Sequence, residues 1–571
     1  MKSIFSNKTP HVNLQRNAFD LSHSDVLSIA PGMLLPIHVS EVNPNEHFEI
    51  EPANYVRTMP LNSAAFTRLK QHIEFYFVPM RTLCRQFNQF VVGTDYKISS
   101  LASLNSYKGS LPLFDLLREV NNFVSGTGTT PNNMFGFPIV SDFVRLLDML
   151  GYGINTENYK SYKTVTAALK VNPFRLLAYQ KVYYDFYRNP LYELNDPSSY
   201  NIDDTFGTST LTLRDSMKVL RYRNWNKDYF TSLSPSFQGA DYLTTPVSMN
   251  DVLSLGQNEE GDEFGNLRPY TSTDFNWNLQ QGTRNGMAAG LQTSTLGDAD
   301  SALFTIANLR AAYALDKLYR ISIAAGDGDY GSQIKAHYGF DAVHDDWKAK
   351  FIGGCSAPIQ ISEVITTATT SDSEGIIGNV GDIKGKGVSL NQGKFTFDSR
   401  EHGIILGLLS IVPEADYQSS MIDRFNFKSS REHYFQPEFQ DLGKQAVTSL
   451  ELSSLPRQFD QSQSITLPNN IIGFNNRYME YKTCVDKVHG IFNSAGPLGS
   501  WASPRNNPLF EDMTTSTMQI NNSSLKVDPR ILNPIMLVSY DGTESTDPFI
   551  CDCHVSVQAI RPMSVSGEPM L

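Results

Sequence analysis

The pattern of apolar and polar residues predicts β-strands near both ends of the chain. Over residues 69–77 the apolar side chains alternate with polar ones, as in a strand with one buried face, and Pro79 ends the run. The predicted buried face holds Leu69, Ile73, Phe75 and Phe77, and the opposite face holds Lys70, His72, Glu74 and Tyr76. Near the C-terminus, Phe549, Cys551, Cys553, Val555 and Val557 alternate in the same way with Asp552, His554, Ser556 and Gln558.

Other elements follow from shorter signals. Further strands are predicted at 34–42, 47–50, 395–397, 404–412, 446–452 and 535–539. Helix signals lie in the middle: Asn172 and Pro173 open a helix that runs to Asn189, and Ser141 caps a helix over 143–150 that Gly151 ends. Ser301 opens a third helix, which ends near Gly326. Strands at both ends with helices inserted between them favour an antiparallel sandwich.

Composition and charge narrow the class of protein. Of 571 residues, 40% are apolar and 11% aromatic, which suits a large β-rich core and excludes disorder, collagen or coiled coil as the main state. Lys and Arg total 47 against 59 Asp and Glu, a net charge of −12, so the whole chain is not built to neutralise phosphates. Residues 240–300 hold nine acids and two arginines, and predict a solvent-facing insertion, with a small β subdomain as the alternative.

Cysteine usage and the N-terminus bear on where the protein is made. The five cysteines are odd in number and far apart, which indicates a reducing compartment rather than a disulfide framework. The first twenty residues contain no continuous apolar run and no cysteine that could carry a lipid, so we expect no secretory signal. The longest apolar run, over 403–413, is about half of the ~20 residues needed to span a bilayer.

No motif in the sequence predicts catalysis. Residues 378–387 are glycine-rich, but Val380 and Gly387 stand where a Walker A loop needs Gly and Ser or Thr, so we interpret the stretch as a flexible loop. Residues 551–554 include Cys, Asp and His, but a strand points Cys551 and Cys553 inward and the other two outward, which predicts core cysteines. We therefore expect no enzymatic activity, no cofactor and no metal.

One segment has nucleic-acid character. Residues 221–230 interleave Arg221, Arg223 and Lys227 with aromatic rings such as Trp225, and this combination holds single-stranded nucleic acid through its phosphates and stacked bases. The alternative is that the rings are buried and the arginines pair with acids at an interface. The mildly basic N-terminal residues add Lys2, Lys8 and Arg16 as candidate DNA contacts.

Several motifs along the chain are similar to those of one virus family. They include 32–37 (GMLLPI), 74–81 (EFYFVPMR), 178–181 (AYQK), 223–231 (RNWNKDYFT), 401–403 (EHG) and 477–482 (RYMEYK). With these motifs the chain resembles, from about residue 19 to 490, the major capsid proteins of the Microviridae, small icosahedral single-stranded DNA phages, and in particular the gokushovirus-like branch. The similarity is weaker over 94–166, over 240–300 and after Pro504.

The resemblance implies a fold and a role. The implied fold is mainly β: an eight-stranded antiparallel viral jelly roll with long helical and loop insertions, forming a single elaborated domain over 1–571. Within it, 1–20 would be a basic N-terminal arm, 94–166 a helical insertion and 240–300 an acidic surface insertion. The implied role is structural, as the major capsid protein of a T=1 icosahedral virion that assembles in the cytoplasm of the host bacterium from about 60 copies.

The implied partners are other copies of the chain, the packaged circular single-stranded DNA, a small basic DNA-binding protein, a DNA pilot protein and a host-cell receptor reached through 240–300. A different class of protein would match the size, aromatic content and acidity equally well: a secreted or surface glycan-binding protein or glycosidase of a gut bacterium. That alternative requires an export signal or a lipid-anchored cysteine near the start, and the first twenty residues show neither.

Overall fold

A computed structural model describes most of the chain outside the segment between residues 236 and 329. The described ranges are 16–92, 111–124, 132–164, 168–203, 211–235, 330–340, 347–365, 383–440, 443–453, 471–493, 496–502 and 522–565, with shorter pieces between them. The chain divides into two compact units, one formed by Met1–Phe237 with Val343–Leu571 and the other by Gln238–Ala342. The predictions for Lys2 and Lys8, for 240–300 and for most of the helix from Ser301 lie outside the described residues.

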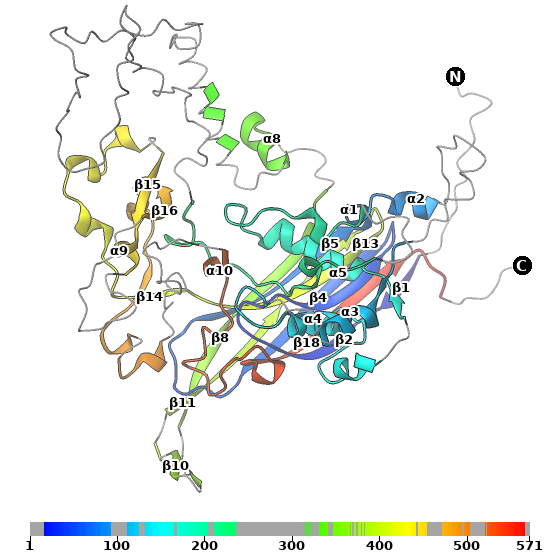
Figure 1. The fold of residues 1–571 in the computed structure, drawn as a ribbon, viewed down its shortest axis with the longest axis horizontal. Coiled ribbons are helices and arrows are strands. Elements are labelled where there is room, and N and C mark those ends of the chain that lie inside the picture. The colour runs from blue at the N-terminus through cyan, green and yellow to red at the C-terminus, as the bar shows by residue number, and fades with distance from the viewer. Residues whose placement is uncertain are drawn as a thin grey trace, which may run out of the picture. The chain divides into compact units, whose positions relative to one another are not determined.

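The first unit is built on one large antiparallel sheet (Figure 1). Eight strands form a continuous path in the order β1-β18-β4-β11-β8-β5-β13-β3, and outside this path β2 pairs with β18 and β12 pairs with β4. Their bounds are β1 (Asn17–Asp20), β2 (His23–Ile29), β3 (Leu35–Val42), β4 (His47–Thr58), β5 (Leu69–Pro79), β8 (Lys350–Ile365), β11 (Ile383–Gln392), β12 (Phe395–Asp398), β13 (Gly403–Pro413) and β18 (Phe549–Arg561).

The two additional strands continue strands of the eight-strand path. β1 and β2 pair with successive parts of β18, and β11 and β12 pair with successive parts of β4. The sheet therefore has ten strands in all. Along one side of β18 and along one side of β4, two shorter strands follow each other end to end.

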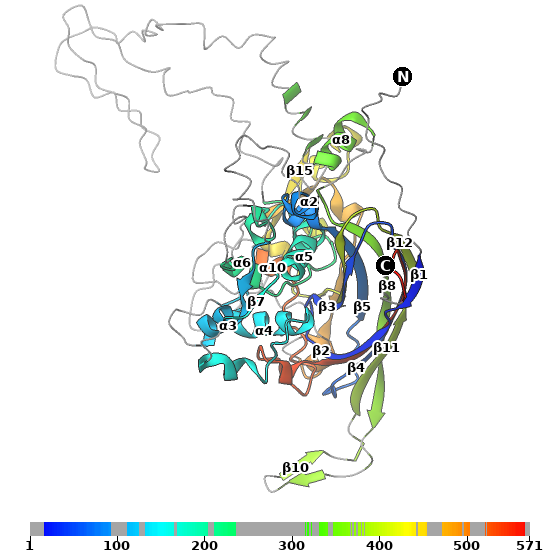
Figure 2. The ribbon, with the colours of Figure 1, turned by 90° about the vertical axis from the view of Figure 1, so that its right-hand side faces the viewer.

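The sheet curls strongly, so that strands far apart in its order face each other (Figure 2). The rings of Phe75 in β5 and Phe395 in β12 have centroids 5.1 Å apart, and those of Phe77 and Phe397 are 4.8 Å apart. β12 pairs with β4, three steps along the path from β5. A curled antiparallel sheet with long insertions is the jelly-roll architecture expected from the sequence.

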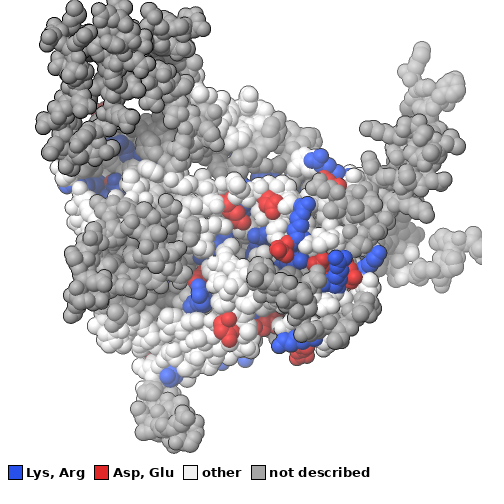
Figure 3. All heavy atoms as spheres, in the orientation of Figure 1, with Lys and Arg blue, Asp and Glu red and all other residues white. Residues whose placement is uncertain are grey.

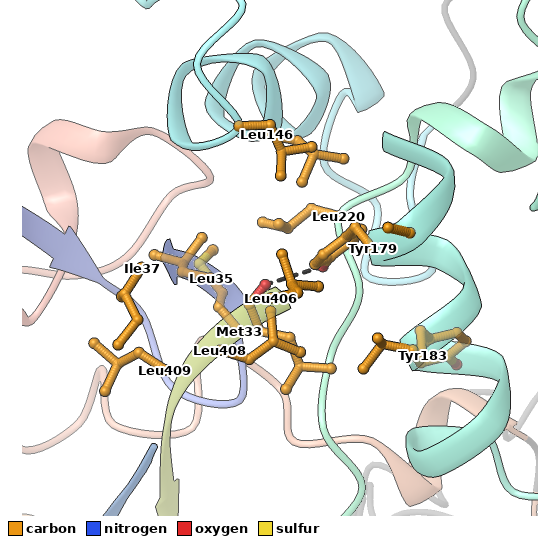
Figure 4. Packing of buried hydrophobic residues seen from close by; sticks show 14 of the residues in the cluster. Met33, Leu35, Ile37, Leu146, Tyr179, Tyr183, Leu220, Leu406, Leu408 and Leu409 are labelled. Atoms are coloured by element: carbon orange, nitrogen blue, oxygen red, sulfur yellow. Dashed lines mark hydrogen bonds between the residues drawn. The ribbon is translucent and has the colours of Figure 1, made fainter. Parts of the chain in front are cut away.

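Helices cover the other face of β3, β13 and β5. α4 (Ile139–Met149) contacts β3, and α5 (Phe174–Val182) contacts β13 and β5. Figure 4 shows this layer, where leucines of β3 and β13 meet Leu146, Tyr179 and Tyr183. The other α-helices among the described residues of this unit are α1 (Met80–Leu83), α2 (Phe87–Val92), α3 (Leu116–Val124), α6 (Asp215–Lys218), α9 (Ser449–Leu452) and α10 (Asn522–Leu525).

Small sheets and one separate helix complete the described elements. Four two-stranded sheets pair β6 (Phe114–Asp115) with β7 (Lys170–Val171), β9 (Thr370–Asp372) with β10 (Gly375–Gly378), β14 (Asp416–Gln418) with β17 (Asp486–Val488), and β15 (Lys444–Thr448) with β16 (Ile471–Asn476). In the second unit, α8 spans Tyr330–Tyr338. No helix in the described ranges is long and apolar enough to cross a membrane.

The strongest strand predictions are confirmed. β5 ends at Pro79 and buries Leu69, Ile73, Phe75 and Phe77, and β18 buries all five of its alternating apolar residues. The predicted strands at 34–42, 47–50, 395–397 and 404–412 lie in β3, β4, β12 and β13. β13 is buried at every position because the curled sheet covers one of its faces and α5 the other.

Four predictions about strands were wrong. Tyr76 is 3% exposed rather than on an open face, because the segment after α5 packs over it. The strand predicted over 446–452 stops at Thr448, where Glu451 accepts the Thr448 backbone N–H at 3.2 Å and α9 begins. Residues 535–539 form turns, with the Ile535 N–H bonded to the carbonyl of Leu532.

The fourth wrong prediction is the flexible loop over 378–387, because its second half begins strand β11. Glycines in this strand allow close packing against it. A Cβ on Gly387 would lie 2.5 Å from Thr58 Cγ2, and the Gly387 N–H donates to Thr58 Oγ1 at 2.7 Å. The glycines in this strand therefore allow neighbouring side chains to pack closely against the backbone, and they do not indicate a mobile loop.

The helix predictions in the first unit are largely confirmed. α5 begins after Pro173 and continues as a π-helical turn, η3 (Tyr183–Tyr187), which ends before Asn189. α4 ends at Met149, where Gly151 takes a positive φ of 74° and its N–H bonds to the Asp148 carbonyl. α4 begins at Ile139, earlier than predicted, so Ser141 lies in its first turn and bonds back to the Pro138 carbonyl.

Candidate nucleic-acid interface

The segment with nucleic-acid character is an extended chain held on both sides. The Arg223 N–H donates to the Gly32 carbonyl at 2.7 Å, and the Val527 N–H donates to the Arg223 carbonyl at 3.0 Å. Gly32 has a φ of 75°, and a Cβ there would lie 2.6 Å from Val527 Cβ, so the site needs glycine. The glycine of the motif at 32–37 (GMLLPI) therefore supplies the backbone carbonyl that holds the segment at Arg223.

Arg221 is an interior cation. It is 7% exposed, and its Nε donates to Gln180 Oε1 at 2.7 Å while Nη2 donates to the Ser216 carbonyl at 3.0 Å. Its guanidinium also lies over the ring of Tyr183, 4.5 Å from the centroid. Glu193 is the nearest acid, at 3.8 Å. Arg221 therefore bonds mainly to uncharged groups within the same chain.

Arg223 forms a bidentate ion pair with Glu74 of β5. The two nitrogen–oxygen distances are 2.8 and 3.2 Å, and both side chains are mostly buried. Although burial opposes it, the attraction of Glu74 raises the pKa of Arg223. Tyr187 donates a hydrogen bond to the same carboxylate, and Tyr76 donates to Tyr187 Oη at 2.9 Å. Burial raises the pKa of both phenols, so they remain neutral donors.

The other predicted contacts differ in exposure. Trp225 is 5% exposed and packs against Val412 and Val527. Lys227 is exposed, and so is Arg16, whose Nη2 donates to the Asn45 carbonyl at 2.8 Å. Of the four candidates in the segment, Lys227 therefore presents the most accessible cation.

A cavity of about 400 Å³ lies between this segment and β5. The rings of Phe186 and Phe351 line it at 41% and 54% exposure, on either side of Tyr76, whose ring is 4.6 and 5.5 Å from theirs. Lys227 also lines it. Exposed rings beside a cation are chemically suited to a flat aromatic group that carries an anion.

Among the described residues, some polar atoms of the cavity wall have hydrogen-bond or ion-pair partners within the protein, and one buried amide oxygen does not. The buried Oδ1 of Asn224 accepts no hydrogen bond within the described part of the chain, whereas its Nδ2 donates to the Tyr187 carbonyl at 2.7 Å. The acid in the wall, Glu74, is already neutralised by Arg223. The wall therefore offers aromatic surface and the Lys227 cation, while Glu74 and Arg223 are paired with each other.

Sequence reasoning missed a second buried cation next to the segment. Lys526 is fully buried, with its Nζ 3.3 Å from the Tyr187 carbonyl, 3.8 Å from Glu193 and 4.6 Å from the ring centroid of Tyr183. Burial lowers the pKa of Lys526 to about 7. Nothing in the composition around residue 526 indicates burial, because its partners lie more than three hundred residues earlier in the chain.

The predicted core cysteines are confirmed. Cys551 and Cys553 are both buried, and burial raises the pKa of the Cys551 thiol to about 12. The side chains of Asp552 and His554 lie on the exposed face of β18. Across the ranges that the structure describes, no three His, Cys, Asp or Glu side chains are placed to hold a metal ion.

Comparison with known proteins identifies the family. A family model described as "Capsid protein (F protein)" matches residues 7–104 and 152–571. The chain is 24% identical to capsid protein VP1 of Chlamydia phage 1, with 100% of this chain and 98% of that protein covered. It is 23% identical to capsid protein VP1 of the Bdellovibrio phage phiMH2K, with 98% and 96% covered.

These matches confirm the resemblance to Microviridae capsid proteins. The unmatched residues 105–151 fall inside the weakly similar region 94–166, whereas 240–300 and the residues after Pro504 fall inside the matched ranges. A glycan-binding or glycosidase role has no support from them and is set aside. The chain belongs to the phage capsid protein (F protein) family, and its role is structural rather than enzymatic.

Proposed function

We propose that copies of this chain form a T=1 icosahedral shell of about 60 subunits around a circular single-stranded DNA genome. The observation that carries the proposal is the family match over nearly the whole chain, together with a curled sheet whose two faces are both covered near β13. A framework of this kind gives each subunit a fixed shape, which a closed symmetric shell requires. As a capsid protein the chain is a component of the virion, and we place its assembly in the cytoplasm of the host bacterium.

Most phosphate neutralisation in this proposal falls to other molecules. The chain carries −12, and Figure 3 shows acids and bases interspersed on the face drawn, without a continuous basic surface. A small basic DNA-binding protein would supply the missing positive charge, and a DNA pilot protein would complete the particle. Direct contact of this chain with the genome is proposed at Lys227 and the cavity beside it, and at the N-terminal residues Lys2, Lys8 and Arg16.

Charge reversal at Lys227 tests the DNA contact. Lys227→Glu is expected to leave shell yield unchanged and to lower the nuclease-protected DNA per particle. The matched control is Lys386→Glu, at an exposed position of β11. Equal DNA content in both variants and in the unmodified particles would exclude Lys227. Arg221 and Arg223 do not suit this test, because their side chains hold the fold together and their loss would reduce filled and empty shells alike.

The acidic residues 240–300 are proposed to face outward and to contact a host receptor. Seven net negative charges per copy on the inside would repel DNA across a Debye length of about 8–10 Å, whereas outside they keep particles apart. Replacing 242–299 with a short Gly/Ser linker is expected to leave shells closing while host attachment falls. Electron microscopy and adsorption assays measure the two effects, and a chain that no longer forms shells would assign the segment to the framework.

A further inference from the structure

An exposed but well-anchored stretch of the first unit has no role in the interior. Residues 423–440, which we call the aromatic arm, contain three short 3-10 turns and no strand: η10 (Arg424–Phe427), η11 (Arg431–His433) and η12 (Pro437–Phe439). None of the residues of these three turns is buried.

The arm nevertheless has fixed attachments to the rest of the unit. Arg424 donates to Glu451 at 2.7 Å and to the Ala446 carbonyl at 2.8 Å. Tyr478, with a φ of 61° and 2% exposure, donates to the carbonyls of Glu432 and Tyr434. These hydrogen bonds fix the arm to the residues around 446–451 and to Tyr478, while the residues of its turns remain at least partly exposed to solvent.

Lys428 anchors the middle of the arm through an ion pair with Glu480. Its Nζ lies 2.9 Å from Glu480 and 4.4 and 4.0 Å from the ring centroids of Phe425 and Tyr481. The Lys428 side chain is only 3% exposed. The cation therefore orders the aromatic rings around it and is not offered to an outside partner.

Aromatic rings dominate the outer side of the arm. Phe425, Phe427, Tyr434 and Phe435 are exposed at 44%, 39%, 53% and 47%, and Tyr481 beside them at 46%. The ring centroids of Phe425 and Tyr481 are 5.0 Å apart and those of Phe435 and Tyr481 are 6.4 Å apart, so these three rings form one cluster, and the Tyr434 ring centroid lies 5.8 Å from Lys428 Nζ beside it. Clustered exposed apolar side chains mark interaction sites, and aromatic residues are enriched where proteins meet.

The charge of the arm indicates the kind of partner. It holds three acids and three Lys or Arg residues, with a net charge of zero, and two of its cations are already paired with Glu451 and Glu480. An uncharged surface has no attraction for DNA phosphates. Because the whole chain carries −12, two copies repel each other, and a neutral aromatic surface is where they can approach at the lowest electrostatic cost.

We propose that the aromatic arm is a contact surface between neighbouring copies of this chain in the capsid. The inference rests on self-assembly of the capsid protein and adds the surface that carries it. Rings held rigidly by the attachments below would bury their apolar outer side against the next subunit, with little ordering of side chains on association.

Oxidative footprinting of the unmodified chain tests the arm directly. The reactivity of Phe425, Phe427, Tyr434 and Phe435 is measured by mass spectrometry in the unassembled chain and in purified assemblies. We expect at least about fivefold protection in the assembly, because interface cores exclude water. Leu194, exposed at 88% and distant in sequence, is the internal reference. Equal reactivity of the arm in both samples would overturn the proposal.

Substitution gives the second readout. The double variant Phe427→Ser with Tyr434→Ser is expected to melt within a few degrees of the unmodified chain and to lose at least about tenfold in assembly yield, since tenfold corresponds to only about 1.4 kcal/mol. The matched control, Val26→Ser with Leu194→Ser, removes two side chains exposed at 78% and 88% and should assemble normally. Normal assembly of the arm variant would contradict the inference.

The two tests separate this inference from the proposed architecture. Assemblies of another symmetry, or without DNA, would overturn the T=1 genome-containing shell, while protection of the arm would still be measured in them. If the double variant fails to fold, the footprint of the unmodified chain decides alone.

Discussion

The two faces of strand β5 show two ways in which this capsid protein holds its interior. On one face, Phe75 and Phe77 pack against the rings of Phe395 and Phe397 across the curled sheet. On the other, Glu74 and Tyr76 meet groups from distant parts of the chain. The first face is stabilised by removal of apolar area from water, and the second by paired charges and hydrogen bonds under a helical layer.

The difference lies in how much each face depends on particular partners. Any apolar side chain of suitable size contributes to the Phe75 face, because dispersion and burial are not directional. The Glu74 carboxylate needs Arg223 and Tyr187 at defined distances, and without them it would be a buried charge. The polar face therefore fixes where the segment 221–230 and η3 lie, whereas the apolar face supplies most of the stability.

The largest expected effect is on the apolar face. Phe75→Ala should lower the free energy of unfolding by about 3–5 kcal/mol, because a fully buried ring is replaced by a cavity. Chemical denaturation of the unassembled chain measures this. A variant that unfolds at the same denaturant concentration would show that the curled sheet does not close on Phe75.

Breaking the ion pair should come next. Arg223→Met leaves Glu74 partly buried without its cation and is expected to cost about 2–4 kcal/mol. Adding Glu74→Gln to the same chain should recover part of the loss, because the uncompensated charge is removed. If the loss of unfolding free energy in the double variant equals the sum of the losses in the two single variants, Glu74 and Arg223 are not energetically coupled, and the proposed role of this pair on the polar face is wrong.

Acidification tests the histidines that pack on the two faces of β5. The ring of His38 lies tilted against Phe75 on the apolar face, with the centroids 5.8 Å apart, and burial lowers the pKa of His38 to about 3, below the 6.5 of the unfolded chain. Between pH 6.5 and 3 the unfolded chain therefore binds one more proton at this site, so stability is present above pH 6.5 and falls as the pH drops.

From pH 7 to 5 this histidine should account for about 2 kcal/mol of lost stability, at about 1.4 kcal/mol per pH unit within the window. His72, with a pKa lowered to about 4 by burial, adds to the same trend. His38→Gln should flatten the dependence of the denaturation midpoint on pH over this range. An unchanged slope in the variant would place the acid-sensitive group elsewhere.

The same contrast explains how far the sequence could be interpreted. Period-two patterns predicted β5 and β18 because strands with one apolar face leave a local signal. The partner of Glu74 lies 149 positions away, and no local pattern links the two residues. β11 was mistaken for a loop because its glycines, which allow Thr58 to pack closely, have the composition of a flexible turn.

The candidate DNA contacts show a deeper limit. Cations alternating with aromatic rings are the pattern of a single-stranded nucleic-acid site, and they are equally the pattern of buried cation–π contacts. Arg221 over Tyr183 is of the second kind, and Lys227 is exposed as the first kind requires. Burial separates the two cases, and it is decided by tertiary contacts with α5, α6 and the residues near 526. DNA contact at these residues stays a prediction.

The smallest expected effect lies at the junction of the two faces, at the Tyr76 hydroxyl. Tyr76→Phe removes only the hydrogen bond to Tyr187 and keeps the ring contacts with Phe186 and Phe351. We expect a loss of about 0.5–1.5 kcal/mol, the usual net contribution of one such bond, because Tyr187 still donates to Glu74.

Tyr76→Ala should cost several times more, since this ring is as buried as those on the apolar face. Denaturation midpoints of the two variants, compared with Phe75→Ala, measure the polar and the apolar parts of one side chain separately. If Tyr76→Phe alone costs as much as Tyr76→Ala, the hydroxyl network carries the stability of this face, and the assignment of apolar packing as the main source would have to be reversed there.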